Sequence, residues 1–72
     1  MSVLTSVVTL PNMKWLADAE EVEEAAYLCP LTESVEINLE SHEAILHYTG
    51  KETLEQILLR LAEAGYPASS GS

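Results

Sequence analysis

Two histidines, one cysteine and a run of carboxylates are the side chains of this sequence whose types could support chemistry. Asp18 begins a dense acidic run, which continues with Glu20, Glu21, Glu23 and Glu24. His42 and His47 follow in a second polar stretch. Carboxylates and imidazoles bind borderline divalent cations such as Co(II), Ni(II) and Zn(II). The pattern leaves two interpretations open: an unconventional metal site using Asp18, neighbouring acids, His42 and His47, or solvated surface charges with no cofactor.

Catalysis finds no support in the residue pattern. The sequence contains no recognised motif that pairs a nucleophile with a general base, and no glycine-rich loop that could hold a phosphate. The sole cysteine, Cys29, excludes an internal disulfide framework and belongs to an apolar stripe, where a free thiol packs as a small hydrophobic group. We therefore expect a protein that is not an enzyme. The cysteine usage suits a reducing compartment and predicts a cytoplasmic location.

The charge balance restricts the class of partner. Twelve acids against Lys14, Lys51 and Arg60 give a formal net charge of −9. Such a surface repels nucleic acids and anionic membranes, and it favours a protein partner with a basic patch.

The apolar N-terminal residues lack a basic flank and a clear cleavage site, so we expect no signal peptide and a mature chain that starts at Met1. No apolar run has the length of a membrane span, so no direct membrane insertion is expected.

The first half of the chain predicts a strand followed by a helix. Residues 3–10 are β-branched and uncharged, which is typical of a mostly buried strand, and Pro11 with Asn12 ends it. Residues 15–29 carry apolar side chains at three- and four-residue spacing, which predicts a helix that Pro30 ends. The members of this stripe are Leu16, Ala19, Val22, Ala25, Ala26 and Cys29.

The second half predicts a hairpin and another helix. Residues 34–39 and 44–48 alternate between apolar and polar side chains across a four-residue turn, as paired antiparallel strands do. Residues 53–64 form a second amphipathic helix, with Gly65 as its C-cap. Pro67 restricts residues 66–68 to a short edge strand. The order β-α-β-β-α-β predicts an α+β, ferredoxin-like sandwich with a four-stranded antiparallel sheet and two helices on one face.

Three segments together carry a resemblance to a known family. They are Met13 at the first loop, "SVEINLESHEAILHY" over residues 34–48 and "LEQILLRLAEAGYPA" over residues 54–68. In this order and spacing, the chain resembles the heavy-metal-associated (HMA) domain of copper metallochaperones and of the N-terminal regions of P-type metal ATPases. The resemblance implies one HMA-like domain over residues 1–69 and a flexible tail or linker at 70–72. It also implies that Met13 is buried and that Tyr66 packs beside the loop.

The departures from the family pattern fall in the loop. By the resemblance, Trp15 stands at the first metal-binding cysteine of the family and Asp18 at the second. The family binds soft cations such as Cu(I) through two thiolates, which an indole and a carboxylate cannot replace. The resemblance therefore implies a degenerate HMA-like domain of a metal transport or homeostasis system. It would act as a protein-interaction or regulatory module, such as the N-terminal cytoplasmic domain of a P-type metal ATPase.

Two interpretations of Trp15 remain open. The indole either folds back over the loop and Tyr66, or stays exposed as an anchor for a partner, since tryptophan is enriched at interface hot spots. In the second case the partner would be a protein with a basic patch, such as a metal-transporting ATPase or one of its other domains. The residues expected to make that contact are Trp15, Asp18, Glu20, Glu21 and Glu24.

Overall fold

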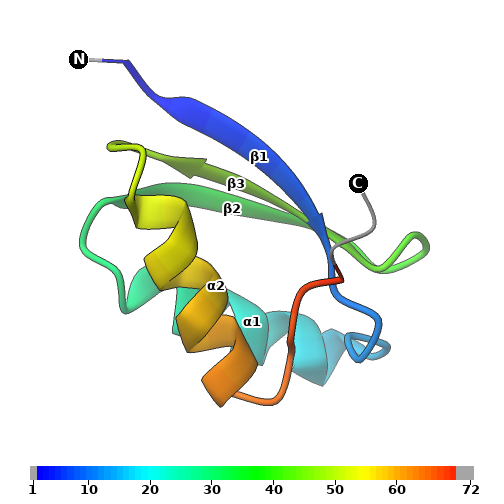
Figure 1. Cartoon of the computed structure of the whole chain (residues 1–72). Helices are drawn as coiled ribbons and strands as arrows, with labels where there is room; N and C mark the ends of the chain where they lie inside the picture. Colours follow the sequence, from blue (N-terminus) through cyan, green and yellow to red (C-terminus); the bar gives the residue numbers. More distant parts are fainter. Residues whose placement is uncertain (1, 70–72) are drawn as a thin grey trace.

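The computed structural model describes residues 2–69 and contains five regular elements in that range. In chain order they are β1 (Leu4–Thr9), α1 (Leu16–Tyr27), β2 (Thr32–Asn38), β3 (Glu43–Tyr48) and α2 (Thr53–Glu63). Both helices lie on the same face of the sheet (Figure 1). The predicted helices and the first three strands are present, with ends that differ from the expected ones by three residues or fewer.

The sheet has three strands within the described residues, where four were expected. β3 lies in the centre and pairs antiparallel with β1 on one side and β2 on the other. The expected edge strand at 66–68 is reduced to a single bridge, in which the Ser69 amide donates to the Thr9 carbonyl at 2.7 Å. Pro67 has no amide hydrogen to donate to a ladder, which explains why pairing begins only after it. The tail or linker proposed for residues 70–72 lies outside the described residues.

The core lies between the sheet and the two helices. Alternate residues of β3 face it, as predicted, and Ala44, Leu46 and Tyr48 are buried. β1 was expected to be mostly buried, but its side chains alternate and Val7 is exposed. The helices cover only one face of the sheet, so every second residue of an edge strand faces solvent. The fully buried side chains of largest volume are Leu10, Met13, Leu46, Ile57, Leu61 and Val22.

The end of α2 sets the direction of the C-terminal segment. Gly65 has φ +97°, in the left-handed region that glycine enters without a steric penalty. The Gly65 amide donates to the Ala62 carbonyl at 3.0 Å, and the Tyr66 amide donates to the Leu61 carbonyl at 2.8 Å. These two bonds form a Schellman motif, which reverses the chain after the helix. As a result, Tyr66 turns back into the core beside the first loop.

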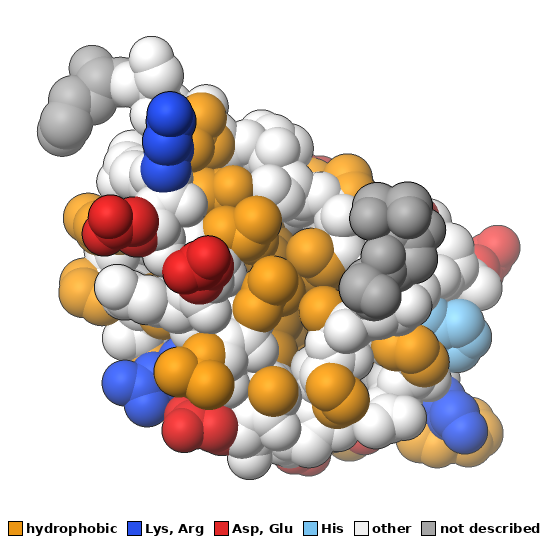
Figure 2. Space-filling view, viewed as in Figure 1, with side chains coloured by type: hydrophobic (Ala, Val, Ile, Leu, Met, Phe, Trp, Pro, Cys, Tyr) orange, Lys and Arg blue, Asp and Glu red, His pale blue; other side chains and the backbone are white. Residues whose placement is uncertain are grey.

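The face on which α2 lies carries a gathering of apolar side chains in its middle (Figure 2). Leu54 and Leu58 of α2, and Leu4 and Val8 of β1, pack against the core but are only half-buried. Within the described residues, β1 has a neighbouring strand on one side only, apart from the bridge at Ser69. The core is therefore less completely covered along β1 than along β3.

Candidate functional site

The loop between β1 and α1 is braced by the turn between β2 and β3. The Leu10 amide donates to the His42 carbonyl at 2.7 Å, which extends the pairing of β1 with β3 by one step. The His42 ring also contacts the loop, with Nδ1 2.7 Å from the Met13 carbonyl oxygen. A carbonyl oxygen only accepts, so Nδ1 is the donor. His42 has φ +58°, a conformation in which histidine is enriched among non-glycine residues.

Asp18 closes the same loop from the start of α1. Its Oδ2 accepts hydrogen bonds from the Lys14 amide at 2.9 Å and the Trp15 amide at 3.0 Å. Its Oδ1 accepts a hydrogen bond from the Tyr66 hydroxyl at 2.8 Å. Trp15 is the N-cap residue and Asp18 the third residue of α1, so this carboxylate makes the return half of a capping box. Indole has no acceptor oxygen, and the helix therefore begins without a side-chain cap from Trp15 itself.

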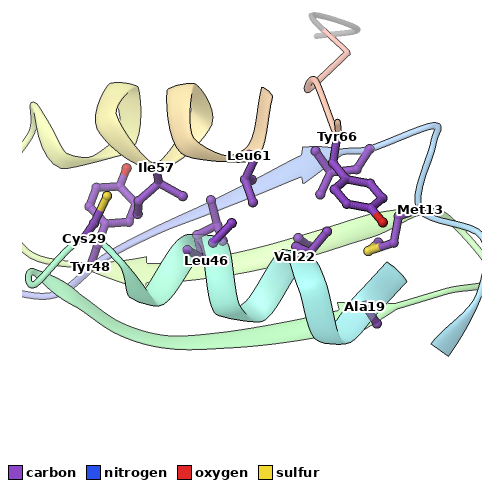
Figure 3. Packing of buried hydrophobic residues seen from close by; sticks show 13 residues of the cluster. Met13, Ala19, Val22, Cys29, Leu46, Tyr48, Ile57, Leu61 and Tyr66 are labelled. Carbon is purple, nitrogen blue, oxygen red and sulfur yellow. The ribbon is translucent and has the colours of Figure 1, made fainter. Parts of the chain in front are cut away.

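The end of α2 contributes the third brace. The Asn12 side-chain amide donates to the Gly65 carbonyl at 3.1 Å. Tyr66, placed by the turn at Gly65, is buried and lies next to Met13 at one end of the core (Figure 3). The loop is thus held by the β2–β3 turn, by Asp18 and by the segment after α2.

The hydrogen bonds on Asp18 change two pKa values. The pKa of the Asp18 carboxyl is lowered from its ordinary 3.8, mainly by the Lys14 amide, then by the Tyr66 hydroxyl and the Trp15 amide. The same hydroxyl bond, with burial and the nearby negative charges of Asp18 and Glu21, raises the pKa of Tyr66 to about 12. Both shifts favour an ionised Asp18 accepting from a neutral Tyr66, so this arrangement persists over the whole physiological pH range.

Trp15 and Leu16 project from the braced loop into solvent. The side chains are 72% and 69% exposed, respectively. An indole folded over the loop and Tyr66 does not fit this exposure. Leu16 was expected in the buried stripe of the helix, and this expectation is wrong, because the buried face of α1 begins only at Ala19. Two consecutive large apolar side chains are thus exposed where the loop enters α1.

The acidic residues of α1 lie mostly on its solvent side. Glu20, Glu21 and Glu24 are exposed, whereas Ala19 and Val22 are buried. Of the expected contact residues, Trp15 and these three glutamates are accessible on one helix. Asp18 differs from them, because both of its oxygens already accept hydrogen bonds from within the chain.

The residues considered for an unconventional metal site are not brought together. His42 bonds the Met13 carbonyl, whereas Asp18 bonds the Lys14 and Trp15 amides. His47 lies five residues beyond His42 along the hairpin, roughly 17 Å at 3.4 Å per residue. His47 faces the open side of the sheet, where Nε2 is 2.8 Å from Glu36 Oε2 and Nδ1 is 3.1 Å from Thr5 Oγ1. Within residues 2–69, no three His, Cys, Asp or Glu side chains are grouped as metal ligands would be.

Cys29 lies at the far end of the core from this loop. It is buried, as predicted, and packs near Tyr48 and Ile57 rather than near Met13 (Figure 3). The loop therefore contains no thiol, and its one carboxylate is a hard ligand occupied by three internal donors. This donor set does not fit a soft cation.

Sequence reasoning missed the bracing roles of Asn12 and His42. Asp18 stands three residues after Trp15, the spacing of a capping box, but Trp15 is not the serine or threonine that marks this motif in a sequence. No local signal identifies the bonds from Asn12 to Gly65 and from His42 to Met13, because they join residues 53 and 29 positions apart.

Comparison with known proteins places this geometry among solved structures. At the level of sequence, no family model and no curated protein matches the chain. In structure, it is similar to oxidized MerP from Ralstonia metallidurans CH34, with a TM-score of 0.87, 22% identity and coverage of 99% of this chain and 100% of that one. A structure described as "Crosstalk between Cu(I) and Zn(II) homeostasis" has a TM-score of 0.83 and 26% identity, covering 92% and 96%. Apo-CopP from Helicobacter pylori has a TM-score of 0.81 and 12% identity, covering 92% and 100%.

The fold is that of the heavy-metal-associated domains. The HMA-like domain matches these structures over nearly its whole described length, and the ferredoxin-like order of elements predicted from the sequence is present. Within residues 2–69, neither helix of the HMA-like domain is long and apolar enough to cross a membrane. Its loop differs from the pattern expected of the family, since residues 10–18 contain no cysteine.

Proposed function

We propose that this HMA-like domain is a protein-interaction module of a metal-homeostasis system, in which a contact surface has replaced the two-thiolate metal site. The observation that carries the proposal is the Asp18 carboxylate with its three internal donors. An anion supplied by the chain holds the loop in shape, so the loop needs no bound cation to be ordered. The non-enzymatic and cytoplasmic assignments, and the place beside or within a P-type metal ATPase, are part of this proposal.

The braced loop makes Trp15 suitable as an anchor. An exposed aromatic side chain contributes most to binding when its backbone is already fixed, because little conformational entropy is lost on association. The Trp15 amide is fixed by Asp18, and the loop on which it stands is fixed by His42 and Asn12. The exposed glutamates of α1 (Glu20, Glu21 and Glu24) lie on the same helix and would steer a partner with a basic patch toward the anchor.

A capture experiment tests the anchor. The wild-type domain, Trp15→Ala and Leu31→Ala are immobilised and used to capture proteins from a lysate of the source organism. Leu31 is a matched control, because it is also a large apolar side chain that is 52% exposed. We expect a common partner for the wild type and Leu31→Ala that is lost with Trp15→Ala. An identical set of captured proteins for all three would contradict the role of Trp15.

A metal titration tests the replaced site. The amide spectrum of the domain is recorded while Cu(I), Zn(II), Co(II) or Ni(II) is added. We expect no localised shifts at micromolar metal, because Asp18 is already satisfied and the histidines are apart. Saturable shifts confined to residues 12–18 or 40–47 would reject the proposal in favour of metal binding through Asp18, His42 or His47.

A further inference from the structure

A second accessible surface lies along the seam between α1 and α2. Two hollows open there, and Leu28 lines both of them. The first has a volume of about 190 Å³ and is lined by Leu28, Cys29, Pro30, Gln56, Leu59 and Arg60. The second has a volume of about 230 Å³ and is lined by Glu21, Glu24, Ala25, Leu28 and Ala64. Small side chains at Ala25 and Ala64, and the departure of the chain from the helix at Pro30, leave this space between the helices.

The first hollow is open to solvent and mainly apolar, with Gln56 and Arg60 as its polar lining residues. Leu28 is 69% exposed and Leu59 is 59% exposed, although they belong to different helices and line the same hollow. Neither leucine belongs to the core or to the half-buried residues that pack on it. Single exposed leucines are common on protein surfaces, but two that share one depression provide a place for an apolar side chain of a partner.

The second hollow is acidic. Glu21 and Glu24 line it, and α1 as a whole has five acidic residues and no basic one. Arg60 in the first hollow does not offset this charge, because its guanidinium is 3.3 Å from Glu63 of its own helix. The seam therefore combines an apolar depression at one end with negative charge at the other.

The charge selects the kind of occupant. A second copy of this chain would bring two surfaces of net charge −9 together, which like-charge repulsion opposes. A basic segment of another protein is complementary. Glu24 and Glu21 lie four and seven residues before Leu28, which is about 6 and 10 Å along the helix at 1.5 Å per residue. A helical ligand spans the same distances between a leucine and lysines four and seven residues away.

We propose that the seam between α1 and α2 binds a basic amphipathic helix of a partner protein, with an apolar side chain in the Leu28–Leu59 hollow and lysine or arginine beside Glu21 and Glu24. The inference rests on the proposed function as an interaction module, but it assigns residues other than Trp15. The two surfaces share Glu21 and Glu24, and they are separated by mutation of Trp15, which precedes α1, or of Leu28, which follows it.

The probe for this surface is a synthetic helical peptide that carries a leucine with lysines four and seven residues away. A second peptide, with glutamate in place of each lysine, serves as the charge control. Amide spectra of the full chain are recorded during titration with each peptide. We expect shifts centred on Ala25, Leu28, Leu59 and Ala64 with the lysine peptide and none with the glutamate peptide.

Matched variants separate the seam from general charge attraction. We expect Leu28→Ser to reduce the affinity for the lysine peptide about fivefold or more, as loss of a central contact does. We expect the same reduction, in a separate experiment, from the Glu21→Gln/Glu24→Gln pair. The control variants are Leu31→Ser and the Glu33→Gln/Glu40→Gln pair, which remove the same apolar group and the same charge from exposed positions that line neither hollow. We expect the controls to change the affinity less than about twofold, as rim positions do. All four variants change exposed side chains, so the dispersed amide spectrum of the folded domain should be retained.

Two results would overturn the inference. Equal weakening by both glutamate pairs would show that the peptide responds to net charge alone. Shifts confined to residues 12–16 that disappear in Trp15→Ala would place the peptide at the loop. In the second case the seam would be excluded as the binding site, and the proposed function would stand. The proposed function is tested separately, by comparing the proteins captured by the wild type and by Trp15→Ala.

Discussion

Asp18 is the residue that distinguishes this loop from one that needs a bound ion. The start of a helix presents unpaired amide hydrogens and a positive dipole end, and both favour an anion. A pair of thiolates would meet that preference while binding a cation. Asp18 meets it with a carboxylate whose oxygens face the Lys14 and Trp15 amides and the Tyr66 hydroxyl. The negative charge of Asp18 thus holds the loop together, and no thiolate is left free to bind a metal ion.

The pH dependence of stability tests Asp18 directly. Its pKa is lowered in the folded state, so its contribution to stability is present above the unfolded pKa of about 3.9 and is lost as the pH falls through the folded value. Asp18→Asn retains one oxygen acceptor but no longer titrates. We expect the melting temperature of the wild type to exceed that of Asp18→Asn at pH 7, and the difference to disappear as the pH falls below 3.8.

Glu20→Gln is the matched control for this experiment, because Glu20 is an exposed acid on the same helix. At about 0.15 M salt, where repulsion between distant acids is screened, its melting temperature should differ little from that of the wild type at every pH. A difference between wild type and Asp18→Asn that stays constant down to strong acid would contradict the role assigned to the ionised carboxylate.

Tyr66 provides a spectroscopic view of the same bond. Its folded pKa of about 12 lies above the ordinary 10.0, so its contribution to stability is complete below the unfolded value and is lost as the pH rises through the folded one. In an alkaline titration followed by ring-carbon shifts of the tyrosines, we expect Tyr66 to ionise near pH 12 in the wild type. In Asp18→Asn it should ionise closer to 10. Ionisation of Tyr66 at the ordinary value in the wild type would show that the bond is absent in solution.

At the scale of elements, the spacing of apolar residues predicted the helices and strands. Contacts between distant parts of the chain decided which residues are buried and how many strands pair. Helix α2 was predicted well because its apolar stripe and Gly65 both mark it locally. The strand at residues 3–10 was expected to be mostly buried, and Leu16 to lie in the buried stripe, because residue type alone does not show how far the helices extend over the sheet. The fourth strand was overestimated because Pro67 delays pairing until Ser69. The place of Trp15 and Asp18 in the first loop follows from the family resemblance, whereas the Asn12 and His42 braces depend on the completed fold.

The two left-handed glycines permit a matched test of helix α2. Gly65→Ala should reduce the free energy of unfolding by about 1 kcal/mol, the cost of a Cβ in the left-handed region. A Cβ at Gly65 meets nothing within 4 Å, so no crowding is added. At Gly50 a Cβ would lie 3.1 Å from Thr53 Oγ1, which donates to the Thr49 carbonyl at the start of α2.

Gly50→Ala should therefore cost more than Gly65→Ala, because it combines the same strain with disturbance of the Thr53 hydroxyl. Urea unfolding of both variants measures the difference. Equal costs would indicate that Thr53 moves without loss, and a negligible cost at Gly65 would show that the turn after α2 relaxes to another conformation.

At the scale of the whole molecule, the charge of −9 is concentrated on a small body. The domain measures 34 × 23 × 17 Å, so acids at opposite ends are about one Debye length apart at 0.01 M ionic strength, where that length is about 30 Å. At 0.15 M the Debye length falls to about 8 Å, and only neighbouring charges still repel one another. Self-repulsion should therefore destabilise the folded domain at low salt.

Salt should act on folding and on binding with opposite signs. We expect the melting temperature to rise as sodium chloride is increased from about 0.01 to 0.15 M, because screening removes repulsion within the folded chain. Over the same range, the lysine peptide should bind more weakly, because screening also removes its attraction to Glu21 and Glu24.

The triple variant Glu20→Gln/Glu23→Gln/Glu24→Gln has a net charge of −9 + 3 = −6, so its melting temperature should depend less on salt. A melting temperature that falls with salt would mean that attractive pairs outweigh repulsion. Peptide binding that is insensitive to salt would assign the seam to its leucines alone, with no part for the acidic residues that select the partner.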